Sequence, residues 1–135
     1  MSRYAEGTTV SVERTKAEIE QIITRYGASS YMVGQSAAAA KIAFEVHDRQ
    51  IVFHLPLPDK SEFETYVSGR SRRRRTPAQM LDAHQQACRQ RWRALGLCIK
   101  AKLEAVKAGI TTFEDEFLAH IVLPDGLTIG QHVRP

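Results

Sequence analysis

The sequence of 135 residues contains only two cysteines, one tryptophan and no long apolar run. Cys88 and Cys98 fall within one predicted helix, where about 15 Å along the axis would separate them, too far for a disulfide. No stretch approaches the roughly 18 apolar residues of a membrane span, and residues 1–15 lack the apolar segment of a secretory signal. We therefore expect two reduced thiols and no membrane partner.

Motifs that specify a reaction or a metal site are also missing. The histidines lack the H-x-x-x-H spacing, the cysteines lack further zinc ligands at suitable spacing, and no phosphate-binding glycine loop or nucleophile elbow occurs. The acidic run at 114–116 is explained by a helix start, where negative charge suits the helix dipole. The sequence thus predicts no catalytic residue, no metal and no cofactor, and an enzyme is kept only as an alternative.

Positive charge is concentrated in one short segment. The net charge is +4, and five arginines lie between positions 70 and 75, so the rest of the chain carries about −1. Clustered guanidinium groups bind phosphates through paired hydrogen bonds and release counterions on binding. The run therefore indicates a nucleic-acid backbone, with another acidic partner or a merely solvated loop as the alternatives.

Apolar residues repeat with a helical period in two long segments. Thr15 and Glu18 form a capping-box pattern that predicts a helix over 16–26. Thr76-Pro77 predicts the start of a long helix over 77–108, because proline suits the first helical position. The expected core face of this long helix consists of Leu81, Cys88, Trp92, Leu95, Ile99, Leu103 and Val106.

Between these helices the apolar period changes to two. A short strand is indicated near 31–33, and the alternation over 41–46 and 50–55 predicts a hairpin around a turn at 47–49. Pro56 ends this pattern because proline cannot donate a hydrogen bond to a sheet.

The remaining segments are expected to be shorter elements or loops. Residues 1–14 suggest an extended arm or short strand, and the 57–75 connection suggests an exposed basic loop. A third helix is expected after Thr112, followed by a last short strand at 127–129.

These elements define a single α+β domain over residues 1–135, with polar termini. We expect a small antiparallel sheet, a hairpin or meander, packed against three helices. The long helix would span about 48 Å, more than the width of such a domain, so one end is expected to project or to pair with a partner.

The long helix also carries cations that extend the candidate surface. Arg89, Arg93 and Lys100 fall within about 40° of one another in helical projection. The predicted nucleic-acid-binding residues, expected to share one surface, are Arg70, Arg72, Arg73, Arg74, Arg75, Arg89, Arg93 and Lys100. Trp92 is expected in the core, with base stacking as the alternative.

Several stretches resemble small proteins of tailed phages and prophages. They are Arg25–Ala28, Phe53–Pro58, Trp92–Leu95, Ile99–Val106, Gly109–Glu114 and Phe117–Gly126. The resemblance covers most of the chain apart from the arginine run. It implies a phage-encoded protein working in the cytoplasm of a bacterial host, and it carries over no activity and no site residues.

The leading hypothesis is an accessory nucleic-acid-binding protein that contacts the phosphate backbone without strong sequence specificity. The alternative is a protein-binding module that modulates a host or defence protein, or a component of a phage assembly. In that case the long helix would contact a second copy or a host protein.

Overall fold

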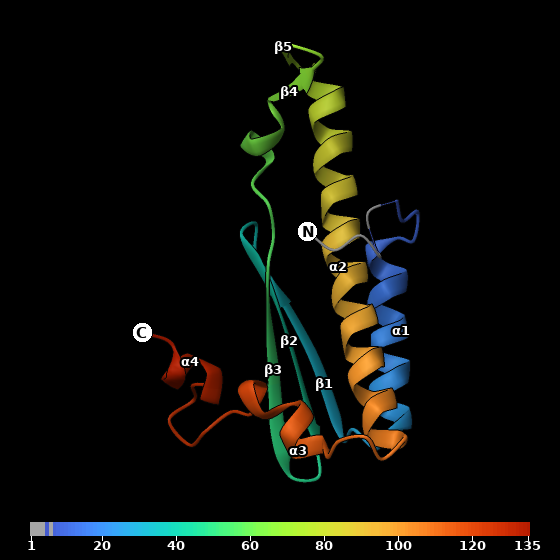
Figure 1. Ribbon diagram of the computed structural model, residues 1–135, viewed down its shortest axis with the longest axis vertical. Coiled ribbons are helices and arrows are strands. Elements are labelled where there is room, and N and C mark those ends of the chain that lie inside the picture. The colour runs from blue at the N-terminus through green and yellow to red at the C-terminus, as the bar shows by residue number, and fades with distance from the viewer. Residues whose placement is uncertain (1–4, 6) are drawn as a thin grey trace.

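The computed structural model describes residue 5 and residues 7–135. In this part of the chain a three-stranded sheet, a separate two-stranded ribbon and four α-helices are present (Figure 1). The α+β class is therefore confirmed. The arm expected over 1–14 lies partly outside the described residues, and its last part belongs to the first helix.

Helix α1 spans Val12–Arg25 and begins earlier than the sequence suggested. The hydroxyl of Ser11 accepts a hydrogen bond from the backbone N–H of Arg14, so Ser11 rather than Thr15 is the N-cap. Thr15 lies one turn inside the helix and is buried. The additional turn places Thr15 against the long helix, a tertiary contact that a local capping pattern does not contain.

The sheet is an antiparallel meander in the order β1 (Ser30–Gln35), β2 (Ala39–Val46) and β3 (Arg49–Pro56). The turn between β2 and β3 is formed by His47 and Asp48, whose φ angles of 53° and 62° fit a type I′ turn. The predicted hairpin is therefore confirmed.

The 57–75 connection is largely exposed, although Pro58 is buried, and it contains more structure than the expected loop. It includes a short 3₁₀ helix, η1 (Lys60–Phe63), and a ribbon made of β4 (Thr65–Ser68) and β5 (Ser71–Arg74). Every residue of β5 is exposed to solvent. No period-two alternation marks this ribbon, because neither of its strands packs on the main core.

Helix α2 spans Pro77–Lys107, and a capping box between Thr76 and Gln79 closes its first turn. The predicted long helix is confirmed, but only its C-terminal half enters the core. The buried residues of α2 are Trp92, Gly96, Ile99 and Leu103. Leu81, expected in the core stripe, is 41% exposed, because the N-terminal half of α2 extends past the sheet and α1 (Figure 1).

The C-terminal segment returns along the edge of β3. Helix α3 (Phe113–Glu116) is one turn long and leads into the 3₁₀ helix η2 (Leu118–His120). The strand expected at 127–129 is wrong: Thr128 makes one isolated bridge to Val122, and helix α4 follows at Ile129–Val133. Thr128 caps α4, so its side chain favours a helix start there.

One hydrophobic core joins these layers. The inner face of the sheet packs against α1, the C-terminal half of α2 and the α3–η2 segment. Its largest fully buried side chains are Trp92, Phe44, Phe117, Ile19, Ile23, Ile42, Ile51, Ile99 and Leu103.

Helices α1 and α2 pack closely against each other at Gly96. A Cβ atom at this position would lie 3.2 Å from Cγ2 of Thr15 and 3.6 Å from Cγ1 of Ile19. Glycine therefore favours the close approach of the two helices, and its backbone freedom is not needed here.

Replacing Gly96 by valine should lower the free energy of unfolding by about 1–3 kcal/mol, because the added methyl groups overpack the α1–α2 contact. Urea denaturation measures this change. The matched control is Ala101→Val at an exposed position of the same helix, which should cost no more than about 0.7 kcal/mol. Equal losses in the two variants would contradict the close contact.

Candidate nucleic-acid interface

The arginine run forms the outer strand of a small two-stranded ribbon. Residues directly opposite in an antiparallel pair project to the same side, so Arg72 and Arg74 share a face with their partners Val67 and Thr65. Arg72 donates a hydrogen bond from one terminal nitrogen to the hydroxyl of Thr65 at 2.9 Å. Arg73 is paired with Tyr66 and belongs to the opposite face.

Arg75 differs from the other arginines because it holds the ribbon in place. Its terminal nitrogen donates to the carbonyl oxygens of Phe63 and Thr65 at 3.2 Å and 3.0 Å. Its guanidinium carbon lies 5.1 Å from the centre of the Tyr66 ring. A guanidinium used in this way has a structural role, so Arg75 is a poorer ligand-binding candidate than the sequence suggested.

The remaining charge of the ribbon has no acidic counterpart. Within the described part of the chain, no ion pair involves any arginine of the 70–75 run. Arg70 lies in the two-residue turn beside Gly69, whose φ of 62° suits the first position of a type II′ turn. The N-terminus of α2 follows at Pro77 and adds the positive end of its dipole. The result is a concentrated positive potential at one end of the molecule.

The cations of the long helix have partners that the sequence did not reveal. Arg89 donates twice to the side-chain oxygen of Gln86, at 2.9 Å and 2.6 Å, and Gln86 donates to the carbonyl of Thr8. Arg93 forms an ion pair with Glu18 of α1. Arg93 therefore ties α1 to α2, and Arg89 orients the Gln86 side chain that holds Thr8, just before α1, against α2.

The two groups of candidate residues do not form one surface. Arg93 and Lys100 lie 17 and 24 residues beyond Thr76, which corresponds to about 26 Å and 36 Å along α2. The segment leading to the ribbon contacts α2 at His84 and Arg91, about 180° away from Arg93 and Lys100 in helical projection. The expectation of a single continuous surface is not met.

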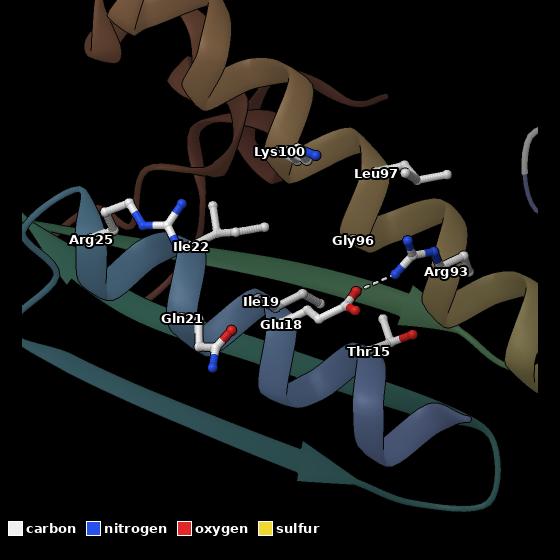
Figure 2. A pocket seen from close by; sticks show the side chains of 10 residues that line it. All are labelled: Thr15, Glu18, Ile19, Gln21, Ile22, Arg25, Arg93, Gly96, Leu97 and Lys100. Carbon is white, nitrogen blue, oxygen red and sulfur yellow. Dashed lines mark hydrogen bonds and ion pairs between the residues drawn. The ribbon is translucent and has the colours of Figure 1, made fainter. Parts of the chain in front are cut away.

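Arg93 and Lys100 instead line a groove between α1 and α2 of about 220 Å³ (Figure 2). Arg25, which the sequence reasoning did not consider, lines the same groove. Arg25 lies seven residues after Glu18, so both side chains lie on one face of α1. This spacing in the sequence could have identified Arg25 as a candidate. The groove is thus a second basic site, separate from the ribbon.

Glu18 is the acidic residue in this groove. Its carboxylate accepts a hydrogen bond from Arg93 and also pairs with Arg14 at 3.4 Å. The hydrogen bond from Arg93, together with the positive charges of Arg93 and Arg14, lowers the pKa of Glu18 against the opposing effect of burial. Glu18 therefore stays ionised in the folded protein to a lower pH than an ordinary glutamate.

Trp92, the residue considered for base stacking, and the phenylalanine residues of the sheet are not accessible. Trp92, Phe44 and Phe53 all lie in the core. Lys16 covers the Trp92 ring, with its amine 4.9 Å from the ring centre. Stacking of bases on the main sheet, as some RNA-binding domains do, would require these rings to face solvent.

One arrangement with catalytic potential is the pair Cys88 and His84. The Cys88 sulfur lies 3.8 Å from Nε2 of His84, but this nitrogen also lies 2.9 Å from the carbonyl of Pro58. A carbonyl only accepts, so Nε2 carries the proton and cannot take one from the thiol. Burial raises the pKa of Cys88 despite nearby arginines. The pair therefore lacks the properties of an activated nucleophile.

Among the described residues, no group of three or more histidine, cysteine or acidic side chains is placed to hold a metal ion. Nor does any helix in residues 7–135 have the length and apolar character needed to cross a membrane. No protein-family model, curated protein or solved structure matches this chain. The resemblance to phage proteins stays a prediction.

Glu18→Gln should lower the free energy of unfolding by up to about 1 kcal/mol near neutral pH, because the ion pair is partly exposed. The folded-state pKa of Glu18 is lowered, so its contribution is present above the unfolded-state pKa and is lost as pH falls through the folded value. The wild-type advantage should therefore begin to decline as pH falls below 4.5, the ordinary glutamate value, and should be lost once the pH is below the lowered folded-state pKa.

Urea denaturation of both proteins across this pH range measures the effect. Glu20→Gln, at an exposed position of the same helix, serves as the control and should show a smaller and flatter difference. A pH-independent loss in Glu18→Gln would contradict an ionised Glu18.

Proposed function

We propose that this chain is an accessory nucleic-acid-binding protein whose β4–β5 ribbon contacts the phosphate backbone. The observation that carries the proposal is the uncompensated charge of the ribbon, chiefly on Arg70, Arg72, Arg73 and Arg74. Each of these side chains is exposed, and no carboxylate in the described part of the chain neutralises it. Arginine suits phosphate because its planar fork donates two parallel hydrogen bonds.

The shape of the ribbon supports contact with a duplex. A two-stranded ribbon fits the major groove of B-form DNA, and arginines projecting from both faces can reach the phosphates on either side. Arg72 and Arg74 lie on one face, whereas Arg73 lies on the other. The one aromatic side chain of the ribbon, Tyr66, already has Arg75 over its ring, which favours backbone contact over sequence reading.

The setting we propose is a phage-encoded protein acting in the cytoplasm of a bacterial host. This part of the proposal rests on the resemblance of the quoted stretches to tailed-phage proteins. An accessory role fits a small domain with one basic projection.

The triple substitution of Arg70, Arg72 and Arg74 by glutamine should weaken binding to both DNA and RNA. The slope of log affinity against log salt should become shallower by about 0.9 for each duplex phosphate that the variant no longer neutralises, or about 0.7 for a single strand. Fluorescence anisotropy with labelled duplexes and single strands over a salt series measures both quantities.

The matched control removes the same charge from exposed positions elsewhere, by glutamine at Lys41, Lys107 and Arg134. It should leave the slope close to that of the wild type. If the slope falls equally in the ribbon variant and the control, net charge rather than the ribbon is responsible and the proposal fails.

A second candidate function is protein binding through the projecting half of α2. A groove of about 680 Å³ lies between α2 and the 57–75 segment. Its floor includes Ala83, Ala87 and Ala94, and Pro58 and Phe63 form an apolar wall. Small side chains on a helix allow a partner's backbone to approach closely. The partner would be a second copy of the chain, a host or defence protein, or a component of a phage assembly.

In this second case Ala87→Arg should abolish the complex, because the larger charged side chain fills the groove. Ala78→Arg, at an exposed position of the same helix, should leave the complex intact. Light scattering of the purified protein detects a dimer, and nuclease-treated affinity capture detects another partner. A monomer that captures nothing after nuclease treatment would reject this candidate.

A further inference from the structure

The groove between α1 and α2 has properties that the backbone-binding proposal does not use. Arg25 on α1 and Lys100 on α2 lie on its two sides with Ile22 between them, and Glu18 reaches across to Arg93 (Figure 2). Half-buried Ile22 on α1 and Leu97 on α2 also line it, and Gln21 lies on its α1 side. The groove therefore combines a cationic rim with an apolar wall.

The charges in this groove do not balance. Three cations line it, Arg25, Arg93 and Lys100, and Glu18 is the acidic residue among its lining side chains. Glu18 already neutralises Arg93, and within the described residues neither Arg25 nor Lys100 forms an ion pair. Two positive charges are left facing one small space. A phosphate monoester, with a charge of about −1.5 to −2 near neutral pH, compensates both, whereas a backbone phosphodiester carries only one charge.

Thr15 lines one end of the groove. Its hydroxyl oxygen is buried and has no hydrogen-bond partner in the part of the chain that the structure describes. Because this atom is closed off from solvent, a ligand in the groove would rely on the cations rather than on Thr15.

The size and lining restrict the ligand that would accompany the phosphate. A volume of about 220 Å³ is below the usual range of about 300–1,000 Å³ for ligand pockets, so the ligand is small. The faces of Ile22 and Leu97 suit a flat ring, and the amide of Gln21 both donates and accepts hydrogen bonds, as the edge of a nucleobase requires.

We propose that the α1–α2 groove binds the 5′-phosphate monoester of a nucleotide, with Arg25 and Lys100 clasping the phosphate from opposite sides. The nucleotide is either a free mononucleotide or the 5′-phosphorylated end of a nucleic-acid strand. Arg93 stays paired with Glu18 and adds its remaining N–H donors. This site contains no residue of the ribbon, so its proposal can be tested independently of backbone binding.

Calorimetric titration with uridine 5′-monophosphate tests the site, with uridine and inorganic phosphate as comparison ligands. We expect saturable binding of the monophosphate, weaker binding of inorganic phosphate and none of uridine. Arg25→Gln and Lys100→Met should each weaken the affinity by about tenfold or more, because each removes a charge-assisted hydrogen bond.

The control variant is Lys107→Met, which removes an exposed lysine about 10 Å further along the same helix, a distance comparable to the screening length in physiological salt. Its affinity should stay within about twofold of the wild type. Circular dichroism and urea denaturation of all variants verify folding, which exposed positions such as Arg25 and Lys100 should not disturb.

Short oligonucleotides with a 5′-phosphate or a 5′-hydroxyl separate the two sources. If the protein binds the 5′-phosphorylated oligonucleotide more tightly than the 5′-hydroxyl one, and Lys100→Met loses this preference, the ligand is a strand end. If the protein binds the mononucleotide but neither oligonucleotide, the ligand is a free nucleotide. The proposal is overturned if the monophosphate does not bind, or if Lys107→Met weakens it as much as Lys100→Met. The ribbon variant should retain the monophosphate affinity, so failure here and failure of backbone binding are distinguishable.

Discussion

The fold depends on the burial of one stripe of α2 against the inner face of the meander sheet. Trp92, Ile99 and Leu103 form this stripe and are almost completely removed from solvent. The sheet supplies Phe44 and Phe53 opposite them, and the α3–η2 segment closes the core with Phe117. Helix α1 can complete the same core because Gly96 lets it approach α2 closely.

This arrangement uses only half of a helix that is 31 residues long. The C-terminal half is covered by the sheet and α1, whereas the N-terminal half contacts mainly the 57–75 segment (Figure 1). The projecting half of α2 thereby places the arginine ribbon far from the core (Figure 1). Arg75 fixes the ribbon to the backbone of that segment, so the other arginines are presented on a structured support rather than on a loose loop.

The distribution of charge follows from this division. Near the core, partly buried cations are matched with acids: Arg93 with Glu18 and Lys102 with Glu116. Removing charge from water is costly, so partly buried cations need partners. The ribbon lies in solvent, where an unpaired arginine costs little. The α1–α2 groove is intermediate, since it contains one matched pair beside two cations that form no ion pair with the residues the structure describes.

Most of the regular elements could be predicted from local patterns. The long helix has a capping box at Thr76 and many turns of apolar spacing, and the β2–β3 hairpin has clear alternation around His47 and Asp48. The ribbon was missed because Ser71–Arg74 has no buried face and therefore no alternation. The start of α1 was misplaced because two capping residues compete there, and packing of Thr15 against α2 favours the earlier one.

The sequence by itself determined the α+β class, the long helix, the main hairpin and the concentration of charge between positions 70 and 75, because each of these is written in residues close together in the chain. Which arginines are available to a ligand depends instead on contacts between distant segments. Arg75 and Arg93 are engaged by groups 10 to 75 residues away in sequence, and Arg25 and Lys100 line one groove although they lie on different helices. Such partners depend on how distant segments pack, and a pattern read along one segment does not contain that information.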